Sequence, residues 1–363
     1  MALGAYISWP FCAQKCTYCN FASGVATRDL ECRYLEALLR EICAWQGAAD
    51  TVYLGGGTPS AMDADDLGRI LTSLKGTSRE TTIEAAPGTL TAQKTAAWAR
   101  AGINRVSLGV QSFVQRELAR TGRKHNAGTV AHDVALLRAH GIPNVNIDLI
   151  AGLPGQTQSS WAESLAATIR LEVPHVSVYM LEVDEDSRLG SEILAGGARY
   201  GANDVPSDDQ IADCYETAVD RLAAHGIRRY EISNFARPGA ESLHNMKYWK
   251  REPYIGFGAD AHSFDGESRW QNVETALDYA DRSARGAALR SGQSTPDPGE
   301  EKFFVGLRLA EGVHADERDW QRFGAAFERL LAAQVLERAD GNLRLTSRGV
   351  MVSNEVFQEF VSL

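Results

Sequence analysis

The sequence predicts an α/β protein whose larger part is a complete or partial (β/α) barrel, followed by a small helical domain. Three observations support this fold class. Short apolar segments alternate with amphipathic ones along residues 1–250, polar or glycine-rich residues follow each apolar segment, and the pattern becomes mainly helical after residue 299. Strands that alternate with helices of this length form βαβ units and parallel sheets. An open doubly wound sheet is the alternative.

The expected strands and helices follow one another from the N-terminus to residue 232. The strands are Ala5–Ser8, Thr51–Leu54, Thr81–Ala85, Arg105–Val110, Val145–Ile150, His175–Met180 and Arg229–Ile232. The helices are Arg28–Trp45, Asp63–Leu74, Ala92–Ala101, Thr129–His140, Ser160–Leu171 and Asp208–His225. Apolar residues recur at helical spacing in these segments, and glycines stop two of them at Gly102 and Gly141.

Chemically distinctive residues stand at or just after the ends of the expected strands. They are the cysteine segment, Gly55–Thr58, Glu84, Gln111, Asp148, and Tyr179 with Glu182. In (β/α) barrels the reacting groups collect at the C-terminal ends of the strands. A single barrel mouth would gather all of these residues, which favours a barrel over an open sheet.

The last third of the chain follows a different pattern. Residues 251–298 have a looser pattern that we interpret as a connection, ending in a linker at Ser291–Gly299. Residues 299–363 predict a helical, winged-helix-like domain with a hairpin that turns at Asp340-Gly341. From Pro296 onward there are eight Lys and Arg against twelve Asp and Glu, the opposite of a nucleic-acid-binding balance. We therefore expect a structural or interaction module.

Composition places the chain among ordinary cytoplasmic globular proteins. It has 363 residues, 44% of them hydrophobic, and a net charge of −10, which disfavours nucleic acid as a partner. No stretch of eighteen apolar residues exists, and the N-terminal segment lacks the features of a signal peptide. We expect no membrane-spanning segment and a location in the reducing cytoplasm, where disulfides are rare.

Three cysteines stand within eight residues, at Cys12, Cys16 and Cys19. Cysteine thiolates hold iron–sulfur clusters, normally four for a [4Fe–4S] cubane, so three would leave one iron open for a small ligand. Zinc is the main alternative, but a structural zinc site closes its shell with a fourth ligand. Unrelated thiols are the less favoured reading. The remaining cysteines, Cys32, Cys43 and Cys214, are expected to be packed thiols.

The C-x3-C-x2-C spacing, followed by Gly-Gly-Gly-Thr-Pro at residues 55–59, resembles the radical S-adenosylmethionine superfamily. Further segments are similar to the oxygen-independent coproporphyrinogen III oxidase-like group, and within it to the HemW-type heme chaperones. They are Tyr6–Cys12, Gly109–Phe113, Asn146–Pro154, Tyr230–Ala236, His244–Trp249 and Arg344–Gly349. Two features separate the chaperones from the oxidases, namely Phe21 where the oxidases carry a further cysteine, and the His-Asn-x-x-Tyr-Trp motif at His244–Trp249.

The resemblance implies a partial (β/α) barrel over residues 1–250 that holds a [4Fe–4S] cluster on Cys12, Cys16 and Cys19 and binds S-adenosylmethionine at the open iron. It implies a HemN-like C-terminal domain at 299–363. The implied cofactor-binding residues are Tyr6, Tyr18, Gly56, Gly57, Thr58, Glu84, Gln111, Arg123 and Asp148. His244 becomes the candidate for heme contact, with His125 and His262 as weaker alternatives, and no catalytic side chain is assigned.

The function implied by the resemblance is a heme chaperone that binds heme and delivers it to heme-accepting respiratory proteins. A homodimer is a further expectation. The alternative is a radical enzyme of the same group, either an oxygen-independent coproporphyrinogen III dehydrogenase or a methyltransferase. A nucleic-acid regulator that uses the C-terminal domain is disfavoured by charge.

Overall fold

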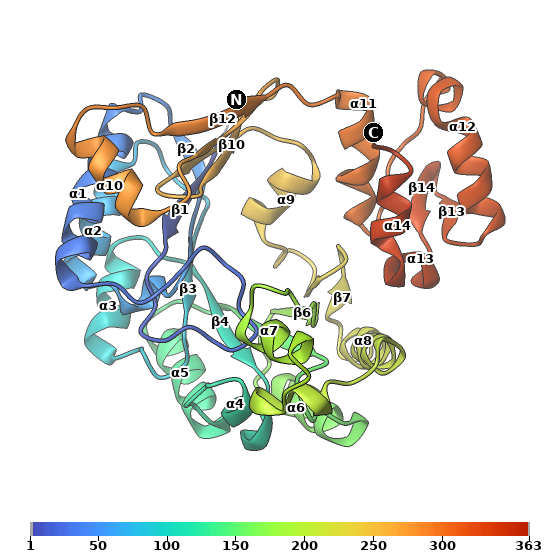
Figure 1. Cartoon of the computed structure of the whole chain (residues 1–363), viewed down its shortest axis with the longest axis horizontal. Coiled ribbons are helices and arrows are strands. Elements are labelled where there is room, and N and C mark those ends of the chain that lie inside the picture. The colour runs from blue at the N-terminus through green and yellow to red at the C-terminus, as the bar shows by residue number, and fades with distance from the viewer. Residues whose placement is uncertain (1–2, 362–363) are drawn as a thin grey trace.

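The computed structural model describes residues 3–361 of the 363-residue chain, and within that range twelve strands form one mixed sheet (Figure 1). The order is β12-β11-β10-β9-β1-β2-β3-β4-β5-β6-β8-β7. Neighbours from β9 through β6 pair parallel, and both flanks pair antiparallel. The strands are β1 (Leu3–Trp9), β2 (Ala49–Gly56), β3 (Glu80–Ala85), β4 (Arg105–Gln111), β5 (Asn144–Ala151), β6 (His175–Met180), β7 (Arg228–Arg229), β8 (Asn234–Ala236), β9 (Tyr254–Phe257), β10 (His262–Phe264), β11 (Arg269–Asn272) and β12 (Arg290–Ser294).

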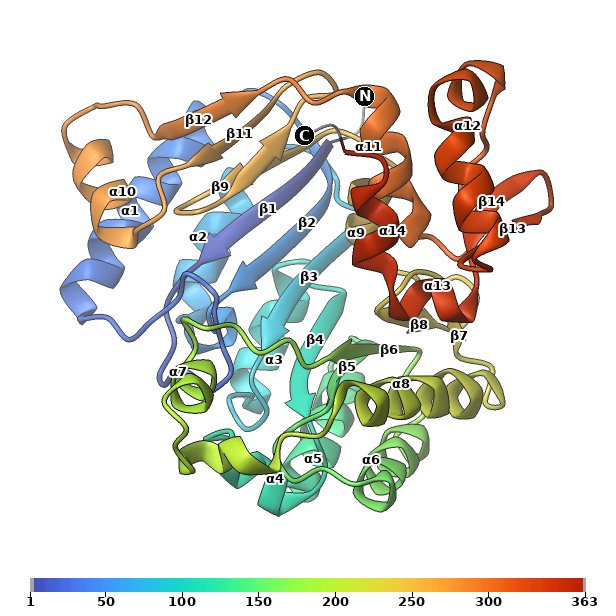
Figure 2. The ribbon, with the colours of Figure 1, turned by 45° about the vertical axis from the view of Figure 1, so that its right-hand side comes forward.

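Helices follow the parallel strands and pack outside the curved sheet (Figure 2). These helices are α1 (Arg28–Ala44), α2 (Ala64–Ser73), α3 (Ala92–Arg100), α5 (Ala127–Ala139), α6 (Gln158–Arg170) and α8 (Asp208–Ala223). The other helices of this part of the chain are η1 (Pro59–Ala61), α4 (Gln115–Arg120), α7 (Arg188–Leu194), η2 (Arg199–Asp204), α9 (Leu243–Trp249) and α10 (Ala276–Ala284). Side-chain caps start many of them; Thr157 and Ser207, for example, form capping boxes for α6 and α8. The fold is therefore a partial (β/α) barrel, as predicted.

The main sheet continues past β6 and β1 in ways that the sequence did not indicate. The expected strand at Arg229–Ile232 is reduced to the two-residue edge strand β7. The expected linker at Ser291–Gly299 was wrong, because β12 pairs with β11 and α11 (Pro298–Phe304) starts before the segment ends. Every residue of β12 is exposed, so the strand has no apolar face that a sequence pattern could reveal.

The C-terminal domain consists of α11, η3 (Gly306–Arg308), α12 (Glu317–Ala332), the hairpin β13 (Leu336–Ala339) and β14 (Asn342–Leu345), α13 (Ser347–Met351) and α14 (Ser353–Gln358). It lies at one side of the barrel (Figure 1). The hairpin turns at Asp340-Gly341 as predicted, with φ of 52° and 83°. Stacked and edge-to-face phenylalanine rings form its core, and Glu301 on α11 joins it to the barrel through Arg251 and Arg269.

Helix α9, which carries the His-Asn-x-x-Tyr-Trp motif, covers the starting ends of β1, β2 and β3. The buried Glu80 carboxylate, at the start of β3, accepts hydrogen bonds from the backbone of Leu243 and His244 at 2.9 and 3.0 Å. It also accepts one from the Ser242 hydroxyl at 3.3 Å. A methyl group added to Gly4 in β1 would lie 3.0 Å from Cδ of Lys247. Helix α9 therefore forms the floor of the barrel.

Glu80→Gln tests this role of the buried carboxylate. The amide keeps the size of the side chain but removes the charge that strengthens the three hydrogen bonds to the start of α9. We expect the free energy of unfolding, measured by urea titration, to fall by about 1–3 kcal/mol. Glu328→Gln, on the exposed face of α12, is the matched control and should change it by less than about 0.5 kcal/mol. Equal effects of the two substitutions would contradict the role.

Candidate functional site

The cysteine segment is a loop that leaves the end of β1 and folds back against it. The backbone N–H of Cys12 donates to the carbonyl oxygen of Gly24 at 2.9 Å, and that of Gly24 donates to Pro10 at 2.9 Å. Cys12, Cys16 and Cys19 are all half-buried, free thiols. Burial raises the pKa of Cys19, the Phe21 backbone lowers it, and the nearby Cys16 and Cys12 thiols raise it further. The three predicted cluster ligands thus lie together at the mouth of the barrel.

The arrangement of the thiols bears on which metal group they fit. Within residues 3–361, no three His, Cys, Asp or Glu side chains are placed to bind one metal ion. A cubane makes a different demand, because each of its irons takes its own thiolate and the sulfur atoms need not converge on one point. The half-buried trio is compatible with a cubane that is held by three thiolates. The other cysteines require one correction, since Cys214 is buried as expected whereas Cys32 and Cys43 are exposed on α1.

Helix α7 and the segment before it hold the cysteine loop from the opposite side. The N–H of Leu189 donates to the carbonyl oxygen of Thr17 at 2.8 Å, and the Asn20 amide donates to the Asp184 carboxylate at 3.1 Å. Figure 2 shows α7 beside this loop. Phe21 and Val25, in the same loop, remain 66% and 71% exposed. The loop therefore presents two large apolar side chains beside the cysteines.

The glycine-rich end of β2 lies directly against the cysteine loop. A Cβ on Gly57 would lie 2.5 Å from the carbonyl oxygen of Phe11, and one on Gly56 would lie 3.2 Å from that of Trp9. Gly56 also has a φ of +109°, which favours glycine. Only Gly55 would direct its Cβ toward the site, with Glu84 and Tyr6 at 3.1 Å. Close packing against β1 is thus a sufficient reason for the glycines at 56 and 57. The family resemblance had assigned these two residues to cofactor binding.

Glu84, at the end of β3, faces the interior of the barrel mouth. Its carboxylate accepts hydrogen bonds from the Tyr53 hydroxyl at 2.9 Å and from the N–H of Gly56 at 3.1 Å. Burial, followed by the charge of Asp148, raises the pKa of Glu84 to about 7. The site therefore holds a carboxyl group that binds a proton more tightly than an ordinary glutamate does, although Arg105 and two hydrogen bonds oppose this shift.

Asp148, on β5, is the second carboxylate of the mouth. Ser107 donates to one of its oxygens at 3.0 Å, and the Asn146 amide donates to the other at 2.7 Å. Burial raises its pKa, while hydrogen bonds from Ser177, Ser107 and Asn146 oppose that shift. Two carboxylates with raised pKa values in one mouth suit a ligand that brings hydroxyl, ammonium or sulfonium groups.

Arg123 connects β4 to the cysteine loop. Its guanidinium donates to the carbonyl oxygen of Gly109 at 3.0 Å and to the Tyr18 hydroxyl at 3.2 Å. The Nε of Arg123 and the Oε1 of Gln111 are buried without a hydrogen-bond partner. Gln111 also has a φ of +69°, an uncommon conformation outside glycine. Unsatisfied buried polar atoms are costly, so this corner of the site fits a polar ligand such as a carboxylate or an amine.

His244 does not lie with these residues. It is fully buried on α9, its Nδ1 bonded to Thr51 at 3.0 Å and its Nε2 to the Tyr248 hydroxyl at 2.7 Å. Burial, followed by the charges of Lys247 and Arg105, lowers its pKa to about 3. Both ring nitrogens are engaged at the floor, several residues before the strand ends, so this geometry does not support the predicted contact with heme.

The two weaker histidine candidates differ. His125 is buried, and its Nε2 is bonded to the carbonyl oxygen of Val110 at 3.0 Å. His262 is exposed at the start of β10, just past the end of β9, and β9 runs parallel to β1. Of the three histidines considered, His262 is thus the exposed one.

Sequence reasoning missed two polar residues that line the mouth. They are Tyr53, which donates to Glu84, and Asn146, which donates to Asp148. Strand periodicity was the available signal, because Tyr53 and Asn146 each stand two residues before a residue already singled out, Gly55 and Asp148, and so share its face.

The fold and the mouth define a protein of the radical S-adenosylmethionine superfamily. The model of that superfamily matches residues 6–167, and the HemN C-terminal domain matches residues 293–352. The class implies a [4Fe–4S] cluster and S-adenosylmethionine as cofactors. The solved coproporphyrinogen III oxidase (HemN) from Escherichia coli has the same fold, with a TM-score of 0.83 over 99% of this chain and 90% of that one at 20% identity.

The chain belongs to the family of HemW heme chaperones. It is 34% identical to the heme chaperone HemW of Lactococcus lactis over 98% of this chain and 97% of the relative. It is also 34% identical to that of Bacillus subtilis over 98% of both chains. The mitochondrial radical S-adenosyl methionine domain-containing protein 1 of Bos taurus is 30% identical over 88% of this chain and 75% of the relative. The recognition made from the sequence motifs is therefore confirmed.

The raised pKa of Glu84 predicts a pH-dependent contribution to stability. A carboxyl that binds its proton more tightly when folded adds stability at low pH, and this is lost as the pH rises from its ordinary pKa of 4.5 to about 7. We expect wild type to lose stability relative to Glu84→Gln across this window. Urea unfolding of both proteins without cofactors, at several pH values, measures the difference. A difference that stays constant with pH would contradict the shift.

Proposed function

We propose that this chain is a HemW-type chaperone that binds heme at the barrel mouth and passes it to heme-accepting respiratory proteins. The observation that carries the proposal is the exposure of Phe21 and Val25 in the loop of the cluster cysteines. A large apolar side chain that is two-thirds exposed costs solubility, and such patches mark ligand or partner sites. A flat apolar macrocycle is the ligand that the names of the HemW relatives indicate.

In this proposal Cys12, Cys16 and Cys19 hold the [4Fe–4S] cluster. When bound, the cluster can supply the electron that cleaves the sulfonium of S-adenosylmethionine. Residues around the mouth hold that cofactor: Arg123 and Gln111 offer their unsatisfied polar atoms to its amino acid end, and Glu84 and Asp148 accept from its hydroxyl and ammonium groups. Tyr6, Tyr18 and the Gly56–Thr58 segment border the same space.

Heme would lie over the cysteine loop, against Phe21 and Val25. Val183 is 38% exposed and adjoins Asp184, which the Asn20 side chain ties to this loop. Burial of such apolar surface supplies most of the affinity for a macrocycle. His262 is the candidate ligand with an accessible ring, because His244 lies at the floor with both nitrogens engaged.

Further expectations concern the setting of this function. No helix within residues 3–361 is long and apolar enough to cross a membrane. A cytoplasmic location, a homodimer and delivery of heme to respiratory proteins stay predictions. The division into a barrel at 1–250, a connection at 251–298 and a C-terminal domain at 299–363 also stays a proposal, although four strands of the main sheet lie within the connection.

The cluster assignment makes a direct prediction. Replacing Cys12, Cys16 or Cys19 with Ala should abolish the iron–sulfur absorbance after anaerobic reconstitution, because two thiolates cannot hold a cubane firmly. Cys32→Ala and Cys43→Ala are matched controls that remove exposed thiols from α1, and they should keep the full absorbance and iron content. Loss of the cluster in a control variant, with retention in Cys16→Ala, would show that the ligands are elsewhere.

The heme proposal is tested by titrating heme into the anaerobically reconstituted protein. Wild type should bind heme, and Phe21→Ser should bind it about 10- to 150-fold more weakly, because burial of a phenylalanine contributes about 1.5–3 kcal/mol. Leu277→Ser removes another exposed apolar side chain, which is 52% exposed on α10, and should leave the affinity for heme unchanged. The same sample should not decarboxylate coproporphyrinogen with S-adenosylmethionine and a reductant. Formation of protoporphyrinogen would contradict the chaperone proposal and would support an oxidase activity instead.

The heme spectra of two histidine variants complete this test. His262→Ala should shift the Soret band if an accessible imidazole ligates the iron. His244→Gln should bind heme normally for each folded molecule, since its ring already bonds Thr51 and Tyr248. Loss of heme binding only in a folded His244→Gln variant would restore His244 as the ligand and move the heme site to the floor.

A further inference from the structure

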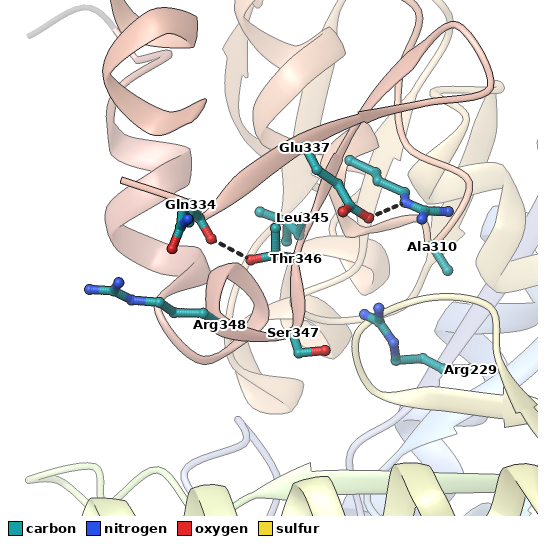
Figure 3. A pocket seen from close by; sticks show the side chains of 9 residues that line it. Arg229, Ala310, Gln334, Glu337, Leu345, Thr346, Ser347 and Arg348 are labelled. Atoms are coloured by element: carbon teal, nitrogen blue, oxygen red, sulfur yellow. Dashed lines mark hydrogen bonds and ion pairs between the residues drawn. The ribbon is translucent and has the colours of Figure 1, made fainter. Parts of the chain in front are cut away.

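A cavity of about 600 Å³ lies where the C-terminal domain meets the edge strand β7, away from the cysteine loop. Residues of both parts line it (Figure 3). From the barrel side comes Arg229 of β7. From the C-terminal domain come Ala310, Gln334, Glu337, Arg344, Leu345, Thr346, Ser347 and Arg348. The volume suits a small organic ligand.

The lining carries an excess of positive charge. Three guanidinium groups, from Arg229, Arg344 and Arg348, share this wall with one carboxylate, Glu337. The Nε of Arg344 donates to Glu337 at 2.7 Å, whereas neither Arg229 nor Arg348 forms an ion pair within residues 3–361. The whole chain carries a net charge of −10, so a local excess of two positive charges runs against the general balance. Like charges held around one cavity repel unless an anion is present.

The groups around the cavity differ in where they point. Figure 3 shows the Arg229 guanidinium directed toward Glu337, with the Ser347 hydroxyl turned to the same space. Arg348 extends away on the far side of Ser347. Arg344 contacts Glu337 on the C-terminal side of the cavity, so the guanidinium groups of Arg229 and Arg344 line the same cavity from the two parts of the chain. The Thr346 hydroxyl is already bonded, to Gln334 and Gly349, and fixes this segment.

We propose that this cavity binds a small ligand with a dianionic oxyanion group, a phosphate monoester or a dicarboxylate. The planar fork of arginine matches the paired oxygens of both groups, and the exposed Ser347 hydroxyl adds a donor. The ligand supplies negative charge to a lining in which arginines outnumber carboxylates. Because Arg229 belongs to the barrel and Arg344 to the C-terminal domain, the bound anion links the two and stabilises their contact. The site is separate from the cluster and from the proposed heme site.

The test uses the full chain and two probes, inorganic phosphate and succinate, each compared with sodium chloride at equal ionic strength. A probe that binds should raise the midpoint of thermal unfolding of wild type above the chloride value. Arg229→Gln and Arg344→Gln should each bind about tenfold more weakly, which corresponds to the loss of one charge-assisted hydrogen bond. Arg318→Gln, which removes an arginine from the first turn of α12 outside the cavity, should behave as wild type.

The outcomes separate the two sources and can refute the site. A shift with phosphate alone assigns a phosphate ester, a shift with succinate alone assigns a dicarboxylate, and shifts with both assign a site that tolerates either shape. The Arg344→Gln substitution leaves Glu337 without its ion-pair partner. If this single variant does not fold, the double variant Glu337→Gln/Arg344→Gln takes its place in the test. No shift beyond chloride with either probe, or the same shift in wild type and in folded Arg229→Gln, would overturn the proposal.

Discussion

Two backbone hydrogen bonds fix the position of the cysteine loop, and the rest of the site depends on them. The N–H of Gly57 donates to the carbonyl oxygen of Trp9 at 2.8 Å, and that of Thr58 donates to Phe11 at 2.8 Å. They extend the pairing of β1 and β2 beyond the last strand residue, so the loop starts from a rigid base. The glycines are part of this constraint, because a side chain at Gly57 would collide with the Phe11 backbone.

The electrostatics of the mouth are prepared for a ligand before one is bound. Glu84 and Asp148 both have raised pKa values, mainly from burial, and each has several hydrogen-bond donors but no ion pair within the described chain. Arg105 is buried at the start of β4 with its Nε unsatisfied. Such groups cost stability in the free protein. A cofactor that carries sulfonium and ammonium charges would supply positive charge beside these carboxylates. The carboxylates are already desolvated in the folded protein, so binding of the cofactor does not have to desolvate them again.

The sequence was informative wherever burial dictates the residue type. The parallel strands β1 to β6 are largely buried, so their apolar runs stood out, and the residues after them could be assigned to one mouth. The exposed strand β12 left no such trace. The sequence could not place His244 for a related reason, since the residue type suits both a heme ligand and a satisfied core histidine. Only the contacts of α9 with Glu80 and Thr51 show at which end of the barrel it lies.

Helix α9 limits the sides from which ligands can reach the interior of the barrel. By covering the starting ends of β1, β2 and β3, it leaves the cysteine-loop side as the entrance to the interior from those strands. The small cofactor and a large flat macrocycle would then both approach the barrel from the side of the cysteine loop. If heme lies on Phe21 and Val25 as proposed, it would be nearer to solvent than a cofactor bound at the buried carboxylates of Glu84 and Asp148. Binding and release of the two molecules would then be coupled.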